Sequence, residues 1–524
     1  MSQEFELVAK TFQGLEDVLA KELIELGAND VQIGRRMVSF TGDKAMMYKA
    51  NFCLRTAIRI LKPIKHFQAN DADTVYEQVK QVPWDLYMDN SKSFAVDAVV
   101  FSEEFRHSKF VAYKVKDAIA DYFREKTGDR PSVSVTNPDI SINIHIAEDK
   151  CTLSLDSSGE SLHRRGYRQE TMEAPLNEVL AAGMILLTGW HGECDLIDPM
   201  CGSGTIPIEA ALIAQNIAPG VFRKGYAFEK WNDFDAELLE NVYNDDSQER
   251  EFEHHIYAYD NSPQAVAVAE RNMKAAGVSK VITLKVQPFQ QFEQPEEKSI
   301  IITNPPYGER ISSEDLLGLY QMIGERFKHA FIGNDAWVLS YKEECFDSIG
   351  LKPSDRISLY NGALACEFRR YQIFGGKYND YRTDHHEEKF KTNRGNFRPH
   401  HLGEKRSDIE HRDREEFEEK KKRSFFKDRH FDGESKEERE PRAKRPERKP
   451  YARREQSDDK PRGGRKFGEK SGERKASGER KFSDRKSDGR FKKDDKRTGE
   501  RKYSRKPAST DKKGKAPRKN NYKE

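Results

Sequence analysis

The stretch DLIDPMCGSGT at residues 195–205, followed by IPIEAALIA at residues 206–214, decides the fold. An apolar run reaches an acid, breaks at a proline, crosses two glycines and enters a helical segment. This order is typical of the first strand, loop and helix of a doubly wound α/β domain, where the loop holds a nucleotide-like ligand. Gly202 and Gly204 permit close approach of the backbone, and a helix beginning at Thr205 offers unpaired N–H groups.

Two familiar phosphate-binding loops do not match this stretch. No lysine follows the glycines, which excludes a triphosphate-binding Walker loop. Pro207 stands at the third glycine position of the dinucleotide pattern G-x-G-x-x-G. Taken alone, such a turn is more often structural than functional, but a later stretch, Asn304-Pro305-Pro306-Tyr307-Gly308, changes this interpretation.

The charge distribution divides the chain of 524 residues into two parts. Residues 376–524 contain 51 Lys and Arg against 32 Asp and Glu, whereas residues 1–375 contain 40 against 57. The net charge of +2 therefore combines a tail of +19 with a body of −17. Because the tail has few aliphatic residues, it cannot bury enough apolar surface to offset chain entropy. We expect residues 376–524 to be a disordered Lys/Arg-rich tail.

Cysteine usage and the N-terminus favour a cytoplasmic protein. The six cysteines are scattered without a C-x-x-C pair, which argues against a metal site or a disulfide framework. The chain starts MSQEFE, without the basic and apolar segments of a signal peptide. No apolar run approaches the roughly 20 residues that a membrane helix needs. The sequence does not indicate an oligomeric state.

The region before the glycine loop is expected to form two α+β modules, at about residues 1–60 and 65–160. In the first we expect strands at 5–9 and 31–40 and helices at 15–26 and 45–54. In the second we expect helices at 75–82 and 109–126, and strands at 93–101, 133–135, 140–147 and 150–156.

Two groups of basic residues are candidates for RNA contact. The first group lies in the second module and includes Arg106, Lys109 and Lys114, and taken alone it is more typical of a solvated helix face. The second group, Arg164, Arg165 and Arg168, lies in HRRGYR at residues 163–168, where it either binds phosphate or crosses a domain junction.

Residues 163–375 are expected to form one Rossmann-like α/β domain, because strand and helix patterns alternate there. After the glycine loop, strands are predicted at 255–260, 281–286, 299–303 and 336–340, helices at 174–187, 263–276 and 316–331, and a hairpin at 356–360 and 363–374 around Asn361-Gly362. The long segment 216–252 is predicted to be irregular, and long ordered loops are often functional.

A second candidate binding residue, Asp260, follows the next predicted strand, where an acid typically binds ribose hydroxyls; capping of the following helix is the alternative. In dinucleotide-binding domains this acid lies about 20 residues past the glycines. Here Asp260 lies 56 residues past Gly204, which argues against NAD.

The stretch Asn304 to Tyr307 predicts recognition of an exocyclic amino group. Pro305 and Pro306 have no N–H groups, so the loop is stiff and its carbonyls face outward. The Asn304 side-chain oxygen and the Pro305 carbonyl can both accept hydrogen bonds from an amine. Those bonds orient the amine and keep electron density on its nitrogen as it attacks. Tyr307 offers a face on which a base can stack.

These motifs, together with SGESLHRRGYR at 158–168, APLNEVLAAGM at 174–184, IAPG at 217–220 and YAFEKW at 226–231, resemble the THUMP-domain-containing RNA guanine-N2-methyltransferases. They are most similar to the bacterial 23S rRNA members of that family, over about residues 1–376. The resemblance implies a ferredoxin-like domain at 1–60, a THUMP domain at 65–160 and a methyltransferase domain at 163–375. It also implies direct methyl transfer from S-adenosylmethionine to guanine N2 in RNA.

The resemblance further implies the site residues. Asp198, Gly202 and Gly204 would line the methionine end of the cofactor, with Cys201, Ser203 and Thr205 in the same loop. Asp260 and Asn261 would hold the ribose, and Asn304, Pro305, Pro306 and Tyr307 the target base. The third strand ends in Gln287-Pro288-Phe289, where many methyltransferases place an acid against the adenine amino group. That contact would pass to the backbone or to packing by Phe289.

Three alternatives stay open. Within RNA, tRNA is the second candidate substrate, since THUMP relatives also bind tRNA acceptor ends. A similar Asn-Pro-Pro-Tyr serves adenine-N6 methylation of DNA, which the THUMP-like module disfavours. The last alternative is a non-catalytic RNA-binding factor in ribosome assembly, and the presence of Asp198, Gly202, Gly204, Asp260 and Asn304 argues against it.

Overall fold

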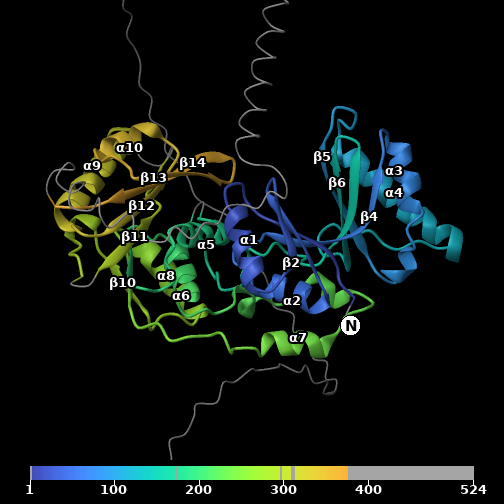
Figure 1. Ribbon diagram of the computed structural model, residues 1–524, viewed down its shortest axis with the longest axis horizontal. Helices are drawn as coiled ribbons and strands as arrows, with labels where there is room; N and C mark the ends of the chain where they lie inside the picture. The colour runs from blue at the N-terminus through green and yellow to red at the C-terminus, as the bar shows by residue number, and fades with distance from the viewer. Residues whose placement is uncertain (1–2, 173–174, 296–297, 308–312, 376–524) are drawn as a thin grey trace, which may run out of the picture. The chain divides into compact units, whose positions relative to one another are not determined.

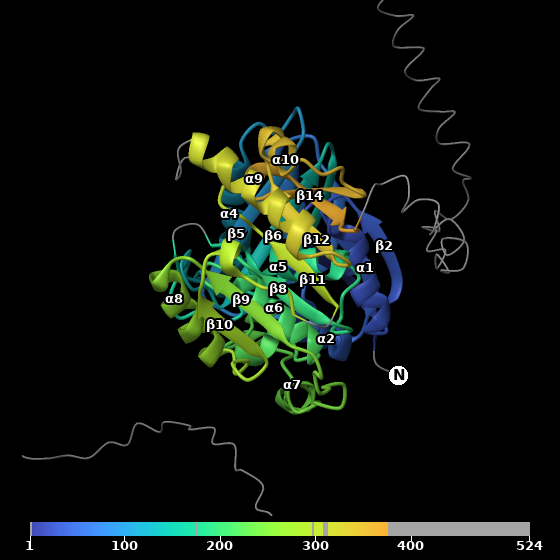
Figure 2. The ribbon, with the colours of Figure 1, turned by 90° about the vertical axis from the view of Figure 1, so that its left-hand side faces the viewer.

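The computed structural model describes residues 3–375, except for 173–174, 296–297 and 308–312. The tail expected to be disordered, 376–524, lies outside the described residues. Two seven-stranded sheets organise the described part, one in the N-terminal region and one in the C-terminal region (Figures 1 and 2). The α/β class with a preceding α+β region, predicted from the sequence, is confirmed.

The first sheet is built by residues 5–156. Its strands are β1 Phe5–Lys10, β2 Asn29–Gly34, β3 Met37–Gly42, β4 Arg59–Gln68, β5 Phe94–Phe101, β6 Ile140–Ala147 and β7 Lys150–Asp156, in the order β2-β3-β1-β4-β7-β6-β5. The helices of this region are α1 Glu16–Glu25, α2 Lys44–Cys53, α3 Ala72–Lys80 and α4 Ser108–Thr127.

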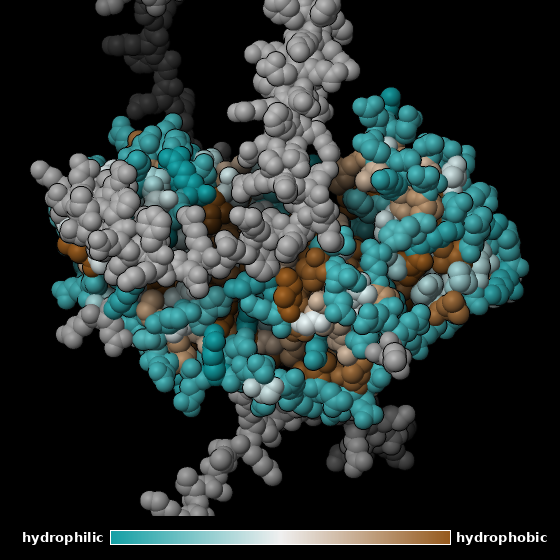
Figure 3. Space-filling model, viewed as in Figure 1, coloured by the Kyte–Doolittle hydropathy of each residue, from teal (hydrophilic) through white to brown (hydrophobic). Residues whose placement is uncertain are grey.

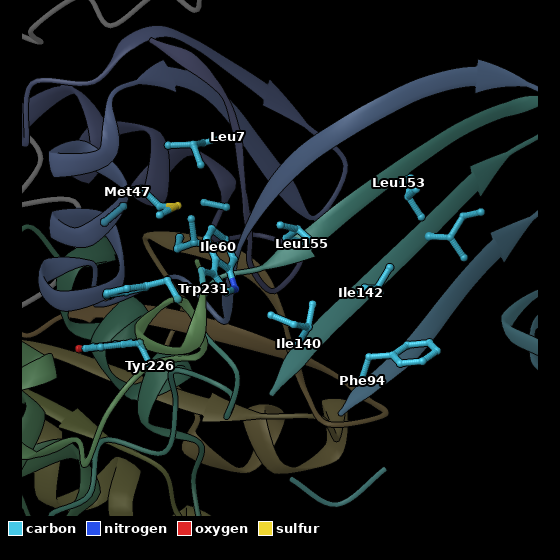
Figure 4. Close-up of a cluster of buried hydrophobic side chains, with 14 of the residues drawn as sticks. Leu7, Met47, Ile60, Phe94, Ile140, Ile142, Leu153, Leu155, Tyr226 and Trp231 are labelled. Atoms are coloured by element: carbon cyan, nitrogen blue, oxygen red, sulfur yellow. The ribbon is translucent and has the colours of Figure 1, made fainter. Parts of the chain in front are cut away.

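Strand β4 joins the two N-terminal modules into one sheet, because it pairs antiparallel with β1 on one side and with β7 on the other. Side chains from both modules share one apolar core, which includes Leu7 and Ile60 as well as Ile142 and Leu153 (Figure 4). Sequence periodicity did not predict β4.

Two strand predictions in this region are wrong. The strand expected at 31–40 is a hairpin of β2 and β3, which turns between Gly34 and Met37. Arg36 has a φ of +58° in this turn. Residues other than glycine seldom adopt this conformation, so the sequence pattern did not indicate a turn at an arginine. The strand expected at 133–135 is reduced to a single bridge between Val133 and Phe94.

The second sheet carries the glycine loop. Its strands are β8 Asp195–Asp198, β9 Ile256–Asp260, β10 Ile282–Val286, β11 Ser299–Thr303, β12 Asp335–Ser340, β13 Asp355–Asn361 and β14 Leu364–Gln372, in the order β10-β9-β8-β11-β12-β14-β13. Its helices are α5 Glu178–Leu187, α6 Thr205–Ala214, α8 Pro263–Ala275, α9 Ser313–Ala330 and α10 Glu343–Ile349. Helix α10 was not predicted.

Helices cover both faces of this sheet, and the strand sequences explain why. In β11, Ile300 and Ile302 pack in the apolar cluster that contains α5 and α6, while Ile301 packs in the cluster that contains α9 and α10. Successive side chains of a strand point to opposite faces, so a strand covered on both sides is apolar throughout. Strand β8 pairs in parallel with β9 on one side and β11 on the other, which places the switch point of the sheet at β8.

The segment after α6 is structural rather than a free loop. It contains two short 3₁₀ helices, Pro219–Phe222 and Ala227–Lys230, and α7 Ala236–Tyr243, which packs on α2 (Figures 1 and 2). The Phe228 ring stacks on the Tyr48 ring with centroids 4.2 Å apart. Tyr226 and Trp231 join the N-terminal core, so this segment attaches the first module to the second sheet (Figure 4).

Three properties of the described residues bear on function. None of their helices combines the length and apolar character that crossing a membrane requires. No three His, Cys, Asp or Glu side chains in these ranges gather closely enough to hold a metal ion. All six cysteines are free.

Candidate active site

A cavity of about 930 Å³ lies at the carboxyl ends of β8, β9 and β11. It is lined by all the predicted cofactor and base residues except Gly204: Asp198, Cys201, Gly202, Ser203, Thr205, Asp260, Asn261, Phe289, Asn304, Pro305, Pro306 and Tyr307. The parallel strands end at one edge of the sheet, and this brings together three loops that are far apart in the sequence.

The two glycines of the first loop have different reasons to be glycine. Gly202 has a φ of +53°, and a Cβ added to it meets no atom within 4 Å, so a ligand can approach the backbone there. Gly204 has a φ of +83° at the start of α6, where an added Cβ lies 3.2 Å from Ala269 and Met273. Gly204 therefore serves the turn and the packing of α6, which explains why it does not line the cavity.

Asp260 ties the glycine loop to β9. Its Oδ2 accepts a hydrogen bond from the Gly202 N–H at 3.0 Å, and its Oδ1 accepts one from the Ser262 N–H at 2.9 Å. A carboxylate has about four acceptor sites, so these two bonds leave capacity for a hydroxyl pair of a ligand. The alternative role considered for this acid, capping of the following helix, falls to Ser262, whose Oγ accepts from the Ala265 N–H at 3.3 Å. Ligand binding by Asp260 stays a prediction that this geometry allows.

Asp198 is the buried acid of the site, and its carboxyl oxygen Oδ1 accepts hydrogen bonds from Thr303 Oγ1 at 3.1 Å and from the Met200 N–H at 3.3 Å. Burial raises the pKa of this carboxyl to about 7, and the neighbouring Asp260 adds to the increase. Asp198 therefore exchanges a proton near neutral pH and gains most from a cationic group placed beside it.

Asn304 carries an unusual acceptor. It follows β11 directly, and its Oδ1 is buried without a hydrogen-bond partner in the described part of the chain. A buried polar atom without a partner is unfavourable unless a ligand completes it. Asn304 also lines the cavity, so a donor on a bound ligand would complete this atom.

Tyr307 is held at the same end of β11 by two contacts. Its hydroxyl accepts a hydrogen bond from Asn361 Nδ2 at 2.7 Å, and its ring meets the Tyr341 ring edge to face at 5.5 Å. Burial raises the pKa of the phenol, which therefore stays neutral at physiological pH.

Phe289 lines the opposite part of the cavity, within a 3₁₀ turn at Phe289–Gln291. Its ring stacks on Phe331 with centroids 5.4 Å apart, which fixes its orientation. The absence of an acid after β10 thus leaves an aromatic wall at this position.

Two of the predicted RNA-binding arginines are structural, and their assignment from sequence is corrected here. Arg165 is 2% exposed and forms an ion pair with Glu209, which is itself fully buried. Arg168 donates to Glu178, to Ser203 Oγ at 3.0 Å and to Thr205 Oγ1 at 2.9 Å, so it braces the glycine loop. Neither guanidinium can reach a phosphate, because its donors are used inside the protein.

The remaining predicted cations lie closer to the surface. Arg106 and Lys109 are exposed. Arg164 is 67% exposed and pairs with Glu160, one turn away. Lys114 pairs with Asp73 at 2.6 Å, so its ammonium group is less available for an RNA phosphate than the other cations are.

No sequence pattern predicted that the β13–β14 turn would lie at the site, yet Asn361, Gly362 and Leu364 line the cavity. The Asn-Gly signal identified a hairpin but not its position. That position depends on the pairing of β14 with β12, and no local pattern encodes this pairing.

Comparison with protein families gives three matches. The description "RMKL-like, methyltransferase domain" matches residues 165–370, "THUMP domain" matches residues 69–156, and "RlmL ferredoxin-like domain" matches residues 6–61. The three matches follow one another along the chain between residues 6 and 370, with short gaps between them.

Comparison with individual proteins decides the family. The chain is 37% identical over 369 residues to a putative RNA methyltransferase, slr0064, of Synechocystis sp., and the alignment covers 70% of this chain and 96% of that protein. The chain belongs to the THUMP-domain-containing RNA methyltransferases. It is also 38% identical to a ribosomal RNA large subunit methyltransferase K/L of Syntrophotalea carbinolica, over 71% of this chain but only 54% of that protein. The chain thus spans about half the length of the K/L relatives.

Among solved structures, this methyltransferase is similar to SMU.472, a putative methyltransferase complexed with SAH. The TM-score is 0.65 at 30% identity, covering 72% of this chain and all of that one. The cofactor of the family is S-adenosylmethionine, and the residues present fit it. Gly202 leaves open space for a ligand, Asp198 provides a carboxylate for a cationic group, Asp260 provides one for a hydroxyl pair, and Phe289 provides an aromatic wall.

The raised pKa of Asp198 predicts that cofactor binding depends on pH. If Asp198 lies at the cationic methionine end, as predicted from the sequence, only its ionised carboxyl attracts that group, and the ionised fraction falls as pH drops through about 7. We expect the dissociation constant for S-adenosylmethionine to rise by about tenfold from pH 8 to pH 6. Isothermal calorimetry at several pH values measures this.

Asp198→Asn is the control for this prediction, because it keeps the shape of the side chain and removes its titration. It should bind more weakly at pH 8 and lose the Asp198 part of the pH dependence. The same pH dependence in both proteins would show that another group is responsible.

Proposed function

We propose that this protein methylates the exocyclic N2 amino group of a guanosine in RNA, with 23S rRNA as the substrate and tRNA as the second candidate. The observation that carries the proposal is the buried, unpaired Oδ1 of Asn304 in the cavity that also contains the glycine loop. An acceptor there fits an amine donor. The relatives named ribosomal RNA large subunit methyltransferase K/L support the choice of substrate.

The proposed mechanism is direct transfer to the amine. S-adenosylmethionine, when bound, supplies a methyl group on a sulfonium. Asn304 Oδ1 and the Pro305 carbonyl each accept a hydrogen bond from the amine. These two bonds orient the nitrogen lone pair away from the base plane. Because Pro305 and Pro306 have no N–H group, the stiff loop does not donate to the same amine. Tyr307 bounds the base site.

The thiol of Cys201 is not needed as a nucleophile. Burial raises its pKa well above the usual range, so it remains a neutral thiol in the cavity wall. An exocyclic amine attacks a sulfonium without covalent activation of its base. Cys201 therefore fits the loop as a small side chain, which favours transfer in one step.

The proposed RNA-contact face lies on the N-terminal half of α4 and the loop before it. Arg106 and Lys109 are exposed there, and Phe110 and Tyr113 are 52% and 58% exposed. Lys116 Nζ lies 5.0 Å from the centre of the Tyr113 ring. Apolar patches interrupt the hydrophilic surface over the α3–α4 region (Figure 3). Cations for phosphate and rings for stacking are the composition that suits RNA.

Nucleoside mass spectrometry of separated rRNA and tRNA, from cells with and without this chain, tests the proposal. We expect loss of N2-methylguanosine from 23S rRNA. Loss from tRNA alone would move the substrate to the second candidate. Loss of N6-methyladenine from DNA instead would replace the proposed base, and no change in any nucleic acid would leave a non-catalytic role in ribosome assembly.

The tail is predicted to act as an RNA-binding arm. Residues 376–524 carry a net charge of +19, and Phe467, Phe482, Phe491 and Tyr503 stand among repeated Gly-Glu-Arg-Lys units. Deleting residues 376–524 should weaken RNA binding and flatten its salt dependence, because fewer counterions are released. The rate at saturating RNA should not change, since every proposed catalytic residue precedes residue 376.

The affinity of the full and truncated proteins for RNA, measured over a range of salt concentrations, checks this prediction. Equal affinities and equal slopes of log K against log salt would show that the tail instead neutralises the acidic body, which carries −17.

A further inference from the structure

We propose that Asn361 is a positioning residue for methyl transfer, and that it acts by fixing Tyr307 while the β13–β14 turn closes the base side of the cavity. The inference rests on the proposed function in one respect: it assumes that Tyr307 lines the site of the target base. Asn361 lies 54 residues beyond Tyr307, outside every motif that indicated the chemistry.

Strand directions bring the turn to the site. Strand β11 runs parallel to β12, β12 pairs antiparallel with β14, and β14 pairs antiparallel with β13. Strand β13 therefore runs in the direction of β11, and both deliver their last residues to the same edge of the sheet. Asn361 ends β13 as Thr303 ends β11, so the turn stands beside the loop that carries Asn304 and Tyr307.

The contact itself is specific. Asn361 Nδ2 donates to the Tyr307 hydroxyl at 2.7 Å, and both residues line the cavity. The other ring contact of Tyr307 is the edge of Tyr341 at 5.5 Å, which restrains the ring without fixing its hydroxyl end. The Tyr307 hydroxyl also interacts with the Cys366 side chain, and the hydrogen bond from Asn361 holds this hydroxyl end in place.

The turn is a firm support because its strands are anchored along their length. Arg370 on β14 pairs with Asp335 on β12 at 2.8 Å and with Asp355 on β13 at 3.2 Å. At the outer strand, Gly14 of the first module packs against the Ser358 carbonyl so closely that an added Cβ would lie 2.5 Å from its oxygen. A residue at the end of such a strand can hold Tyr307 at a defined place.

Loss of the Asn361 contact is expected to change the rate of methyl transfer rather than the affinity for the cofactor. Asn361 touches Tyr307 and not the glycine loop or Asp260, as far as the described residues show. If the hydroxyl end of Tyr307 is free to shift, the base is less well aligned with Asn304, and misalignment lowers the rate of transfer. The affinity for S-adenosylmethionine has no reason to change.

A double-mutant cycle on the full chain tests the proposal with Asn361→Leu, Tyr307→Phe and the double variant. Transfer of labelled methyl groups to saturating rRNA gives kcat, and calorimetry gives the affinity for S-adenosylmethionine. We expect Asn361→Leu to lower kcat about tenfold, the equivalent of one lost hydrogen bond. Cofactor affinity should stay within twofold, and the double variant should be no slower than Tyr307→Phe. Ser358→Ala, an exposed change on the same strand, should match the unchanged protein.

Two results would overturn the proposal: an unchanged kcat for Asn361→Leu, or losses that multiply in the double variant. If Asn361→Leu lowers the melting temperature, Asn361→Ala is measured in the same cycle, and the same two results apply. The label counts methyl groups on any nucleoside. A product other than N2-methylguanosine would therefore contradict the proposed function without deciding the role of Asn361.

Discussion

Asn304→Ala is expected to lower kcat on the order of 100-fold or more while leaving the affinity for S-adenosylmethionine within a few-fold. The variant removes the buried acceptor that has no other partner in the described residues, so the target amine is no longer oriented for attack. The cofactor contacts proposed for Gly202 and Asp260 remain intact. Single-turnover transfer to rRNA and calorimetric titration with S-adenosylmethionine measure the two quantities.

Asp260→Ala is the matched control, since it alters the same cavity from the cofactor side. Its carboxylate holds the Gly202 N–H, so its loss should mainly weaken binding of S-adenosylmethionine. Near-normal turnover by Asn304→Ala would contradict the proposal that Asn304 orients the target amine. Weakened cofactor binding by the same variant would show that Asn304 serves the cofactor rather than the base.

Arg165→Met is expected to lower the free energy of unfolding by about 3–5 kcal/mol. The variant leaves the Glu209 carboxylate fully buried without its ion-pair partner. The Tyr167 hydroxyl at 2.9 Å is then its hydrogen-bond partner in the described residues, and the buried Arg55 guanidinium is the cation that still interacts with it. An uncompensated charge in the interior is far less favourable than the same charge in water. Urea denaturation followed by circular dichroism measures the loss.

The neighbouring arginine supplies the control. Arg164 is 67% exposed and pairs with Glu160 on the surface, so Arg164→Met should change the free energy of unfolding by less than about 1 kcal/mol. Arg165→Met combined with Glu209→Leu should recover much of the loss, because the buried charge is then gone. Equal losses for the two arginines would contradict the buried-pair interpretation.

The local sequence determined the central features of the site. The apolar runs at β8 and β11 identify strands covered on both faces, and the residues that follow them, Asp198 to Thr205 and Asn304 to Tyr307, must then lie at one edge of the sheet. Parallel strands all end at that edge, so two loops about 100 residues apart meet without any knowledge of long-range contacts.

The roles of the basic residues were beyond the sequence. Arg164 and Arg165 are adjacent in one basic cluster, yet one is on the surface and the other is buried. The difference depends on Glu209, which lies 44 residues away on α6. Local composition does not state which face of a segment will be covered, and a charge is buried only where a distant partner meets it.

Tertiary structure also decided what surrounds the site. Strand β4 joins the N-terminal modules into one sheet, the segment after α6 attaches to their core, and Asn361 reaches Tyr307. Each depends on a pairing between distant segments. The sequence by itself determined the loops that meet at strand ends, because strand periodicity and glycine conformation are local properties. Only the order of the strands decided which turn closes the cavity. Every residue except proline carries the same backbone N–H and C=O groups, so a local pattern of side chains does not state which strands will pair.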